Sequence, residues 1–170
     1  MERGEYHDVI SLIDYSESIY KRFDPSSIEE DLGKLYRARI GLSMRSLDRQ
    51  TCLHYARLGL EIEDRRHQKL GTDSSILAVA YNDMAMGYGL NREWEMAIPM
   101  LKRSREIRQR LPGFTKDKLY SPSLQEALIR YYEGEYAKAG HILEEARIDR
   151  QEILGSNDNS IRYVPGHPIH

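Results

Sequence analysis

Residues 81–104 read YNDMAMGYGLNREWEMAIPMLKRS, and this stretch decides the fold. Apolar residues recur in it every three or four positions, which is the period of an α-helix and not of a strand. Small residues such as Ala85 and Ala97 let two helix backbones approach closely, and large side chains such as Tyr88 and Trp94 fill the space around them. The stretch therefore predicts a pair of packed helices.

The same pattern recurs on both sides of this stretch. Residues 105–113, REIRQRLPG, align with residues 147–155, RIDRQEILG, and residues 60–71 form a third, longer copy that also ends in Leu-Gly. A small residue stands upstream of each copy: Ala97 follows Cys52 by 45 residues, and Ala139 follows Ala97 by 42. A near-constant period of this length is typical of stacked structural repeats. The sequence thus predicts three helical hairpins.

The composition of the 170-residue chain suits a soluble helical domain with a core. The 25 Lys and Arg residues nearly balance the 27 Asp and Glu residues, for a formal net charge of -2, which argues against a general attraction to nucleic acid or anionic membranes. A single cysteine, Cys52, excludes an internal disulfide and favours a reducing compartment. Neither a secretory signal nor a run of about 18 apolar residues is visible, so we expect a cytoplasmic protein without a membrane span.

Residues that break helices divide the chain into three parts. A first helix is predicted over roughly 6–22. Ser26 or Ser27, followed by two glutamates, is a start signal for a second helix, whose apolar face continues to Leu47. The expected parts are an N-terminal helix within 1–25, a helical repeat domain over 26–155 and an irregular tail over 156–170.

The copies resemble tetratricopeptide (TPR) repeats, in which bulky, small, aromatic and turn-glycine positions alternate. The matching residues are Tyr81, Met84, Ala85, Tyr88, Trp94, Ala97, Leu101 and Ser104 in the middle copy, Ala127, Gly134, Tyr136, Ala139, Leu143 and Ala146 in the third, and Tyr36, Ile40, Cys52, Ala56 and Gly59 in the first. Arg130 replaces an aromatic, and the first copy lacks the turn glycine. The long period is similar to the kinesin-light-chain variety found in many fungal proteins. The resemblance covers about residues 31–160 and implies an all-α fold, an α-solenoid of three TPR-like hairpins plus an N-terminal helix.

A solenoid of this family implies a concave groove lined by the first helix of each hairpin. Its expected lining is Lys34, Arg37, Gly41 and Arg45 from the first copy, Val79, Asn82, Met86 and Gly89 from the second, and Gln125, Leu128 and Tyr132 from the third. A basic entrance leading to Met, Asn and Tyr side chains suits a peptide or helix that carries acidic residues. We assign partner binding to Lys34, Arg37, Arg45, Asn82, Met86, Gln125 and Tyr132. The alternative interpretation is that these residues are solvated or contact the chain's own first helix.

Two more specific binding modes fit the sequence poorly. The carboxylate clamp with which some members hold a chaperone tail is not matched, because Gly41, Asp83, Ser121 and Gln125 replace its asparagines and basic residues. Residues 102–110, KRSREIRQR, carry five basic side chains that could contact phosphates. Ser104, Ile107 and Leu111 are nevertheless spaced for the core, so we expect the basic side chains on a solvated outer face and no nucleic-acid partner.

Catalysis is not indicated by any motif. The sequence contains no Gly-rich phosphate loop, no paired histidines at metal-ligand spacing and no Gly-x-Ser-x-Gly motif. Cys52 and His54 stand two residues apart, so on a helix they point to different faces, and Cys52 occupies a small packing position. His167 and His170 lie in the tail and make a poor metal site. We expect no enzyme activity, no cofactor and no metal.

These patterns favour a protein–protein interaction module that acts as a scaffold or adaptor. Self-association is a second hypothesis, because end helices of a short array need covering; the expected seam is Tyr131, Tyr132, Tyr136, Ile142 and Ile153. A third possibility is the repeat cassette of a larger signalling protein, since related fungal repeats often follow a nucleotide-binding switch domain. A groove binder is expected to remain monomeric, whereas a self-associating scaffold changes mass with concentration.

Overall fold

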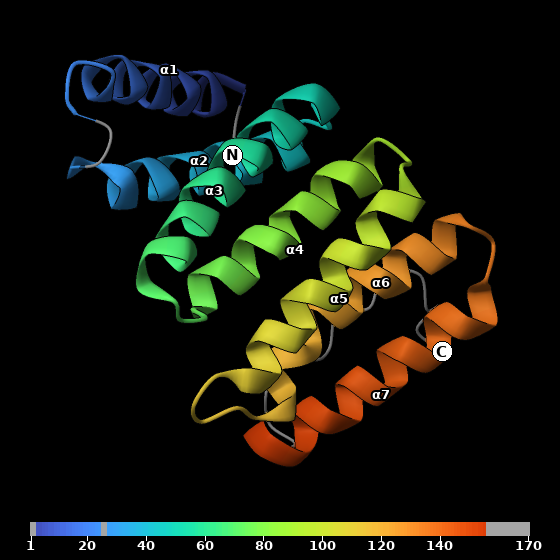
Figure 1. The fold of residues 1–170 in the computed structure, drawn as a ribbon. Helices are drawn as coiled ribbons and strands as arrows, with labels where there is room; N and C mark the ends of the chain where they lie inside the picture. Colours follow the sequence, from blue (N-terminus) through green and yellow to red (C-terminus); the bar gives the residue numbers. More distant parts are fainter. Residues whose placement is uncertain (1–2, 25–26, 156–170) are drawn as a thin grey trace.

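The computed structural model describes residues 3–24 and 27–155, and within these residues the regular structure is entirely helical, with no strand (Figure 1). The all-α prediction is therefore confirmed. The helices are α1 (Arg3–Tyr20), α2 (Glu29–Arg45), α3 (Arg49–Leu70), α4 (Ser75–Leu90), α5 (Trp94–Arg110), α6 (Tyr120–Tyr132) and α7 (Tyr136–Leu154), with a short 3₁₀ helix, η2 (Lys116–Leu119), before α6. The predicted tail over 156–170, with His167 and His170, lies outside the described residues.

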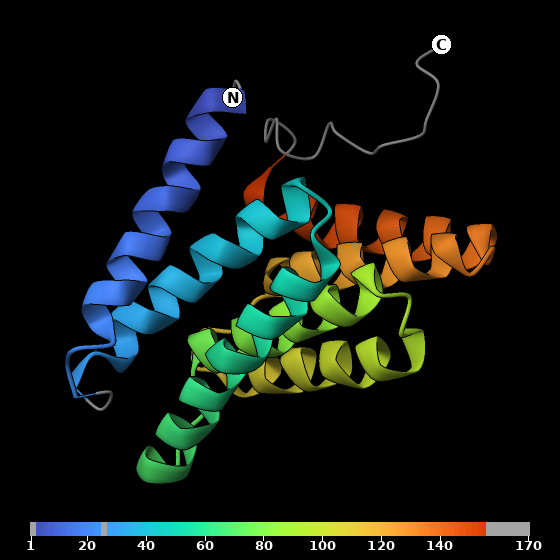
Figure 2. The same cartoon turned by 90° about the horizontal axis from the view of Figure 1, so that it is seen from above.

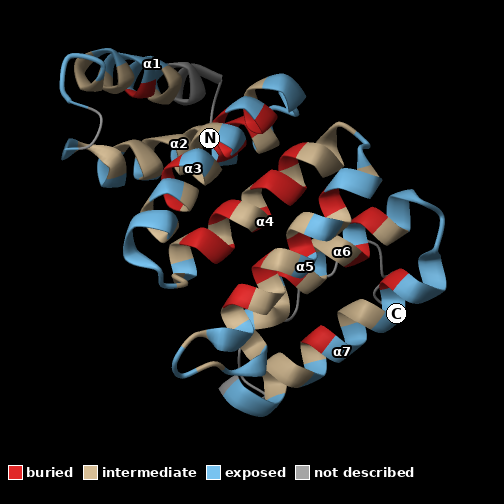
Figure 3. Ribbon diagram, viewed as in Figure 1, coloured by how far each residue is buried: buried red, intermediate tan, exposed pale blue. Residues whose placement is uncertain are grey.

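The helices pack in successive antiparallel pairs, α2 with α3, α4 with α5 and α6 with α7 (Figures 1 and 2). Helix α3 also packs closely on α4, whereas α6 makes far fewer contacts with α5. Helix α1 lies outside the pairs, against α2. Buried residues are most frequent on α4, the helix between the first and third pairs (Figure 3).

The three turns within the pairs are built alike. In each turn one residue has a positive φ and the next amide donates to the carbonyl oxygen five residues earlier, which closes the preceding helix. The positive-φ residues are Leu47 (56°), Arg92 (62°) and Gly134 (85°). The hydrogen bonds run from Asp48 N to Ser43 O (2.8 Å), from Glu93 N to Tyr88 O (3.0 Å) and from Glu135 N to Arg130 O (2.9 Å). The repeat seen in the sequence is thus also a repeat of backbone conformation.

Small residues form the seams between helices, as the sequence predicts. Ala85, Ala97, Ser104, Ala127, Ala139 and Ala146 are all buried. Ser104 satisfies its hydroxyl by donating to the Ala78 carbonyl oxygen at 2.6 Å. The closest approach involves a residue that the pattern did not single out: a Cβ added to Gly87 of α4 would lie 3.0 Å from the Leu53 Cα of α3. Only glycine lets these two backbones pack at this distance.

The two ends of α2 differ from the prediction. Ser27 does not cap the helix, because its Oγ donates to the Asp24 carbonyl oxygen at 2.7 Å; the residue before the helix is Ile28, and Ser26 lies outside the described residues. Helix α2 ends at Arg45, so Leu47 belongs to the turn and is 68% exposed. In all three pairs, the residue five positions before the buried small residue of the following helix adopts the turn conformation. At Leu47 this tertiary requirement outweighs the preference of an apolar side chain for burial.

The expected large partner residues are only partly buried at the end of the array. Leu101 is almost fully buried and Tyr81, Tyr88 and Trp94 are half-buried, but Tyr136 is 64% exposed. As a large residue of the repeat pattern, at the position that Trp94 holds in the middle copy, Tyr136 is expected to fill a gap between helices, and this expectation is wrong. Helix α7 is the last described helix, and no further described helix covers the side on which Tyr136 lies.

Candidate protein-interaction groove

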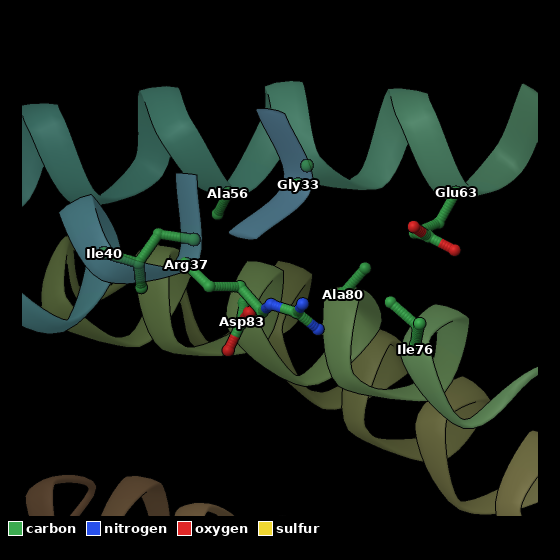
Figure 4. Close-up of a pocket in the computed structure, with 9 residues that line it drawn as sticks. Gly33, Arg37, Ile40, Ala56, Glu63, Ile76, Ala80 and Asp83 are labelled. Atoms are coloured by element: carbon green, nitrogen blue, oxygen red, sulfur yellow. The ribbon is translucent and has the colours of Figure 1, made fainter. Parts of the chain in front are cut away.

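Two of the three basic residues predicted to form the groove entrance, Lys34 and Arg37, lie beside the protein's own carboxylates. Lys34 is exposed, and its Nζ lies 2.8 Å from Glu30 Oε1 and 3.6 Å from Asp31 Oδ1 on the same helix. Arg37 points from α2 across a small hollow to α4, where its guanidinium lies beside Asp83 (Figure 4). Arg45 is exposed in the last turn of α2. An incoming acidic peptide would compete with internal carboxylates for the first two of these cations.

Asp83 is the most perturbed carboxyl group of the described chain. Burial between α2, α4 and α5 raises its pKa from 3.8 to about 6, and Arg37 and Arg108 partly oppose this rise. The same burial lowers the pKa of Arg108. A buried charge of this kind is tolerated because guanidinium groups lie on both sides of it. Asp83 is thus a half-buried carboxyl group that lines the small hollow formed by α2, α3 and α4.

Asn82 is buried as well, with 5% of its surface exposed. Its Nδ2 lies 3.5 Å from Ser121 Oγ, a long contact between α4 and α6, and its Oδ1 has no hydrogen-bond partner among the described residues. Val79 is half-buried and Gly41 is exposed. None of these three residues lines a cavity that could hold a peptide.

A different surface, lined mainly by α4 and α6, forms an apolar hollow. We call it the α4–α6 groove; its volume is ≈ 400 Å³. Its lining residues are Met44, Leu47 and Arg49 from α2, the first turn and α3, Ala85, Met86, Gly89, Leu90, Arg92 and Trp94 from α4, the second turn and α5, and Leu124, Gln125, Leu128, Ile129 and Tyr132 from α6. Of the assigned partner-binding residues, the structure therefore brings together Met86, Gln125 and Tyr132, and it also brings in Gly89 and Leu128.

Exposed apolar side chains form one wall of this groove. Leu124 is 39% exposed, Leu128 is 54% exposed and Tyr132 is 63% exposed. They stand at intervals of four residues on α6, so they make one stripe along the helix. Pro122, Ala127 and Ile129 of the same helix are buried. Helix α6 therefore packs its buried apolar residues into the protein and leaves the stripe of Leu124, Leu128 and Tyr132 largely exposed.

Stacked aromatic rings hold one end of the groove in shape. The rings of Trp94 and Tyr132 are nearly parallel, at 6°, with centroids 6.1 Å apart. Tyr131 makes edge contacts with Tyr132 at 5.8 Å and with Tyr136 at 5.2 Å. Such ring pairs contribute about 0.5–1.5 kcal/mol each beyond the area that they bury. The aromatic wall is thus ordered before any partner arrives.

Among the described residues that line the groove, Arg49 and Arg92 are the charged ones. Both are exposed, and neither forms an ion pair with any residue of the described chain. The two turns that carry them are tied together, because Asn91 Nδ2 donates to the Arg49 carbonyl oxygen at 3.3 Å. The groove is therefore apolar on its floor and cationic at its rim.

The basic run over 102–110 is paired more extensively than expected. Ser104 and Ile107 are buried as predicted, but Arg105 forms an ion pair with Glu126 of α6 and Arg110 Nε lies 2.7 Å from Asp73 Oδ2. Arg103 Nη1 lies 3.4 Å from Glu106 Oε2, and Arg108 is half-buried near Asp83. The expectation of a solvated basic face is wrong for Arg105 and Arg108, which are only partly exposed, whereas Arg110 is exposed as expected and pairs with Asp73 of the loop before α4. Little free positive charge is left on this helix for phosphates.

The remaining reactive groups make no site. Cys52 is fully buried, and burial together with Asp83 and Asp48 raises the pKa of its thiol to about 11. His54 is exposed on the same helix and contacts Tyr55. Among the side chains that the structure describes, no group of three or more His, Cys, Asp or Glu residues is placed to hold a metal ion. Of the described helices, none has the length and apolar character needed to cross a membrane.

The groove residues that sequence reasoning missed are mostly those at the turns. Four of them, Leu47, Arg49, Arg92 and Trp94, come from turns and helix starts. The sequence prediction considered only residues of the first helix of each hairpin, so it did not include them. Leu124 could have been found, because it completes an i, i+4, i+8 apolar stripe with Leu128 and Tyr132. Comparison with known proteins adds no further guide: no family model matches the chain, and no curated protein matches it.

Proposed function

We propose that the protein is a TPR-like interaction module that binds a polypeptide segment in the α4–α6 groove. The observation that carries the proposal is an apolar groove of ≈ 400 Å³ with exposed Leu124, Leu128 and Tyr132 on one wall and two arginines at the rim that form no ion pair with the described residues. Exposed apolar surface gathered in a hollow is typical of a binding site, whereas scattered apolar residues are not.

The TPR-like assignment is supported by three features of the described chain. The helices form consecutive hairpins, the hairpin turns share one conformation, and small residues at the repeated positions are buried at the seams. One hairpin cannot bury its apolar face alone, so neighbouring hairpins stack on each other, as they do in a solenoid. The expectations of a non-catalytic, cytoplasmic protein without a nucleic-acid partner go with this proposal and stay predictions.

The chemistry of the groove selects the kind of segment. Its floor consists of Met, Leu, Ala and Trp side chains, so the segment presents an apolar ridge to it. Its rim carries Arg49 and Arg92, so carboxylates beside that ridge are favoured. The sequence pointed instead to Lys34 and Arg37 as anchors, but these cations lie against Glu30, Asp31 and Asp83.

Selection of binders from a displayed peptide library tests this function. We expect selected peptides to carry apolar residues at helical spacing with nearby Asp or Glu, and to bind the Leu128→Glu variant at least tenfold more weakly than the wild type. Arg49→Glu is expected to weaken the acidic peptides selectively. Gln68→Glu, which adds the same charge at an exposed site on α3, is the matched control and should bind normally. Peptides that bind Leu128→Glu as tightly as the wild type would refute the proposal.

A further inference from the structure

Helix α1 carries apolar surface on two opposite sides. One side packs on α2 through buried Ile13, and Glu17 of this side accepts a hydrogen bond from Tyr55 Oη at 2.8 Å. Asp14 forms an ion pair with Arg39. These contacts fix which face of α1 is turned to the rest of the protein.

The other side of α1 is an apolar ridge that is exposed at Leu12 and Tyr15 and half-buried at Ile19. We define the α1 ridge as Leu12, Tyr15 and Ile19, which share a face because they stand three and four residues apart. Leu12 and Tyr15 are each 65% exposed. A solvated helix face normally carries polar residues at such positions, so a ridge of this kind marks a contact surface.

The α1 ridge and the α4–α6 groove match in length. At 1.5 Å per residue, the ridge is about 10 Å long from Leu12 to Ile19, and the exposed stripe of α6 is about 12 Å long from Leu124 to Tyr132. A helix ridge of this length can lie along the groove and place its side chains between those of α4 and α6. One surface is convex and the other is concave.

The charges at the two surfaces are complementary at one end. Exposed Asp8 stands one turn before Leu12 on the same face of α1. The groove offers Arg49 and Arg92, which form no ion pair among the described residues. Arg22, also exposed, follows the other end of the ridge. Docking is therefore favoured in the direction that brings Asp8 to the arginine rim and keeps Arg22 away from it.

The two surfaces lie on different parts of the molecule. Helix α1 lies against α2 at one end of the array (Figure 2), whereas one wall of the groove comes from α6 in the third helix pair. Helix α1 is held in place by buried Ile13, by Asp14, which pairs with Arg39 of α2, and by Glu17, which accepts from Tyr55 of α3, and none of the three ridge residues lines the groove of the same chain. A second copy can reach it.

We infer that the α1 ridge of one copy occupies the α4–α6 groove of a second copy. This inference rests on the proposed function, since it names an occupant for the same groove. The contact is heterologous: each molecule offers one ridge and one groove, so copies add head to tail and form short chains as the concentration rises. An outside peptide that binds the groove competes with this assembly.

Light scattering after size exclusion, over a hundredfold range of concentration, tests the inference with point variants of the full chain. The wild type is expected to gain mass with concentration. Leu12→Glu, which disables the ridge, and Leu128→Glu, which disables the groove, should each stay at the monomer mass, and Gln68→Glu should behave as the wild type. All three sites are exposed, so circular dichroism should show an unchanged fold.

The decisive sample is an equimolar mixture of Leu12→Glu and Leu128→Glu. One variant keeps an intact groove and the other an intact ridge, so the mixture should form dimers and nothing larger. A wild type that stays monomeric, a Leu12→Glu variant that assembles normally, or a mixture that stays monomeric would each overturn the inference. If self-association fails but wild-type protein still binds the selected peptides, the proposed function stands and only this inference is refuted. If the peptides bind Leu128→Glu as tightly as the wild type, the proposed function is refuted independently.

Discussion

Exchanging Leu47 for glycine is expected to stabilise the protein, although it removes a leucine. Leu47 has a φ of 56°, in the left-handed region that is disfavoured for residues with a Cβ, and the equivalent turn of the third pair has Gly134 there. The side chain is 68% exposed, so its removal uncovers little apolar surface. The backbone conformation, and not packing, therefore decides the effect.

The magnitude follows from two opposing terms. A residue other than glycine in this conformation costs roughly 1–2 kcal/mol. Glycine in turn lowers the free energy of unfolding by roughly 0.5–1 kcal/mol, because it loses more chain entropy on folding than leucine does. The net gain in the free energy of unfolding for Leu47→Gly is about 0.5–1 kcal/mol, which raises the Tm of a domain of this size by about 1–4 °C.

Urea denaturation followed by circular dichroism measures the change, with the slope m as a check that the unfolded state is the same. Arg92→Gly is the matched second variant and should shift the midpoint in the same direction, because Arg92 has a φ of 62°. Gly134→Ala is the reverse variant and should lose about 1 kcal/mol. A lower midpoint for Leu47→Gly at unchanged m would refute the equivalence of the three turns.

Three further predictions concern the interior. Ala97→Leu should cost about 1–3 kcal/mol, because Ala97 has no exposed surface and a larger side chain overpacks the seam between α4 and α5; a variant that melts like the wild type would show that Ala97 is not a seam residue. The pKa of Asp83 is raised from 3.8 to about 6, so its contribution to stability is fully present below pH 3.8 and is lost as the pH rises through 6. The free energy of unfolding of the wild type, relative to that of Asp83→Asn, should therefore fall between pH 4 and 7. A difference that stays constant over this range would contradict the burial of this carboxyl group. With its pKa raised to about 11, the Cys52 thiol should react with a disulfide reagent at pH 8 at least about 100-fold more slowly in the native protein than in urea, and equal rates would mean that α3 does not bury it.

The helical fold and its repeat were readable from local patterns. Apolar spacing, the small residues at Ala97 and Ala139, and the Leu-Gly ends of the copies all depend on contacts within one hairpin or between adjacent helices. The structure confirms the all-α class and the burial of these small residues. The positions at which the prediction failed, Ser27, Leu47 and Tyr136, stand at helix ends or at the end of the array, where neighbours decide the outcome.

The groove could be predicted only in part. Met86, Gln125 and Tyr132 were placed on it by repeat position, because first helices face the same side of stacked hairpins. Arg37 occupies an equivalent position, yet Asp83 of the next pair and burial between the pairs turn it inward. No local pattern reports such a partner, since Arg37 and Asp83 come together only when α2 packs beside α4.

The sequence by itself determined that this chain forms packed helical hairpins, because helix period and small-residue spacing are properties of neighbouring residues. Only the tertiary structure decided where the α4–α6 groove lies, because its lining comes from five helices and two turns that are far apart in the sequence. Its charge was decided in the same way. Ion pairs with Glu126 and Asp73 engage Arg105 and Arg110, whereas Arg49 and Arg92 at the rim form no ion pair with the described residues, and this difference depends on which carboxylates the fold brings near each arginine.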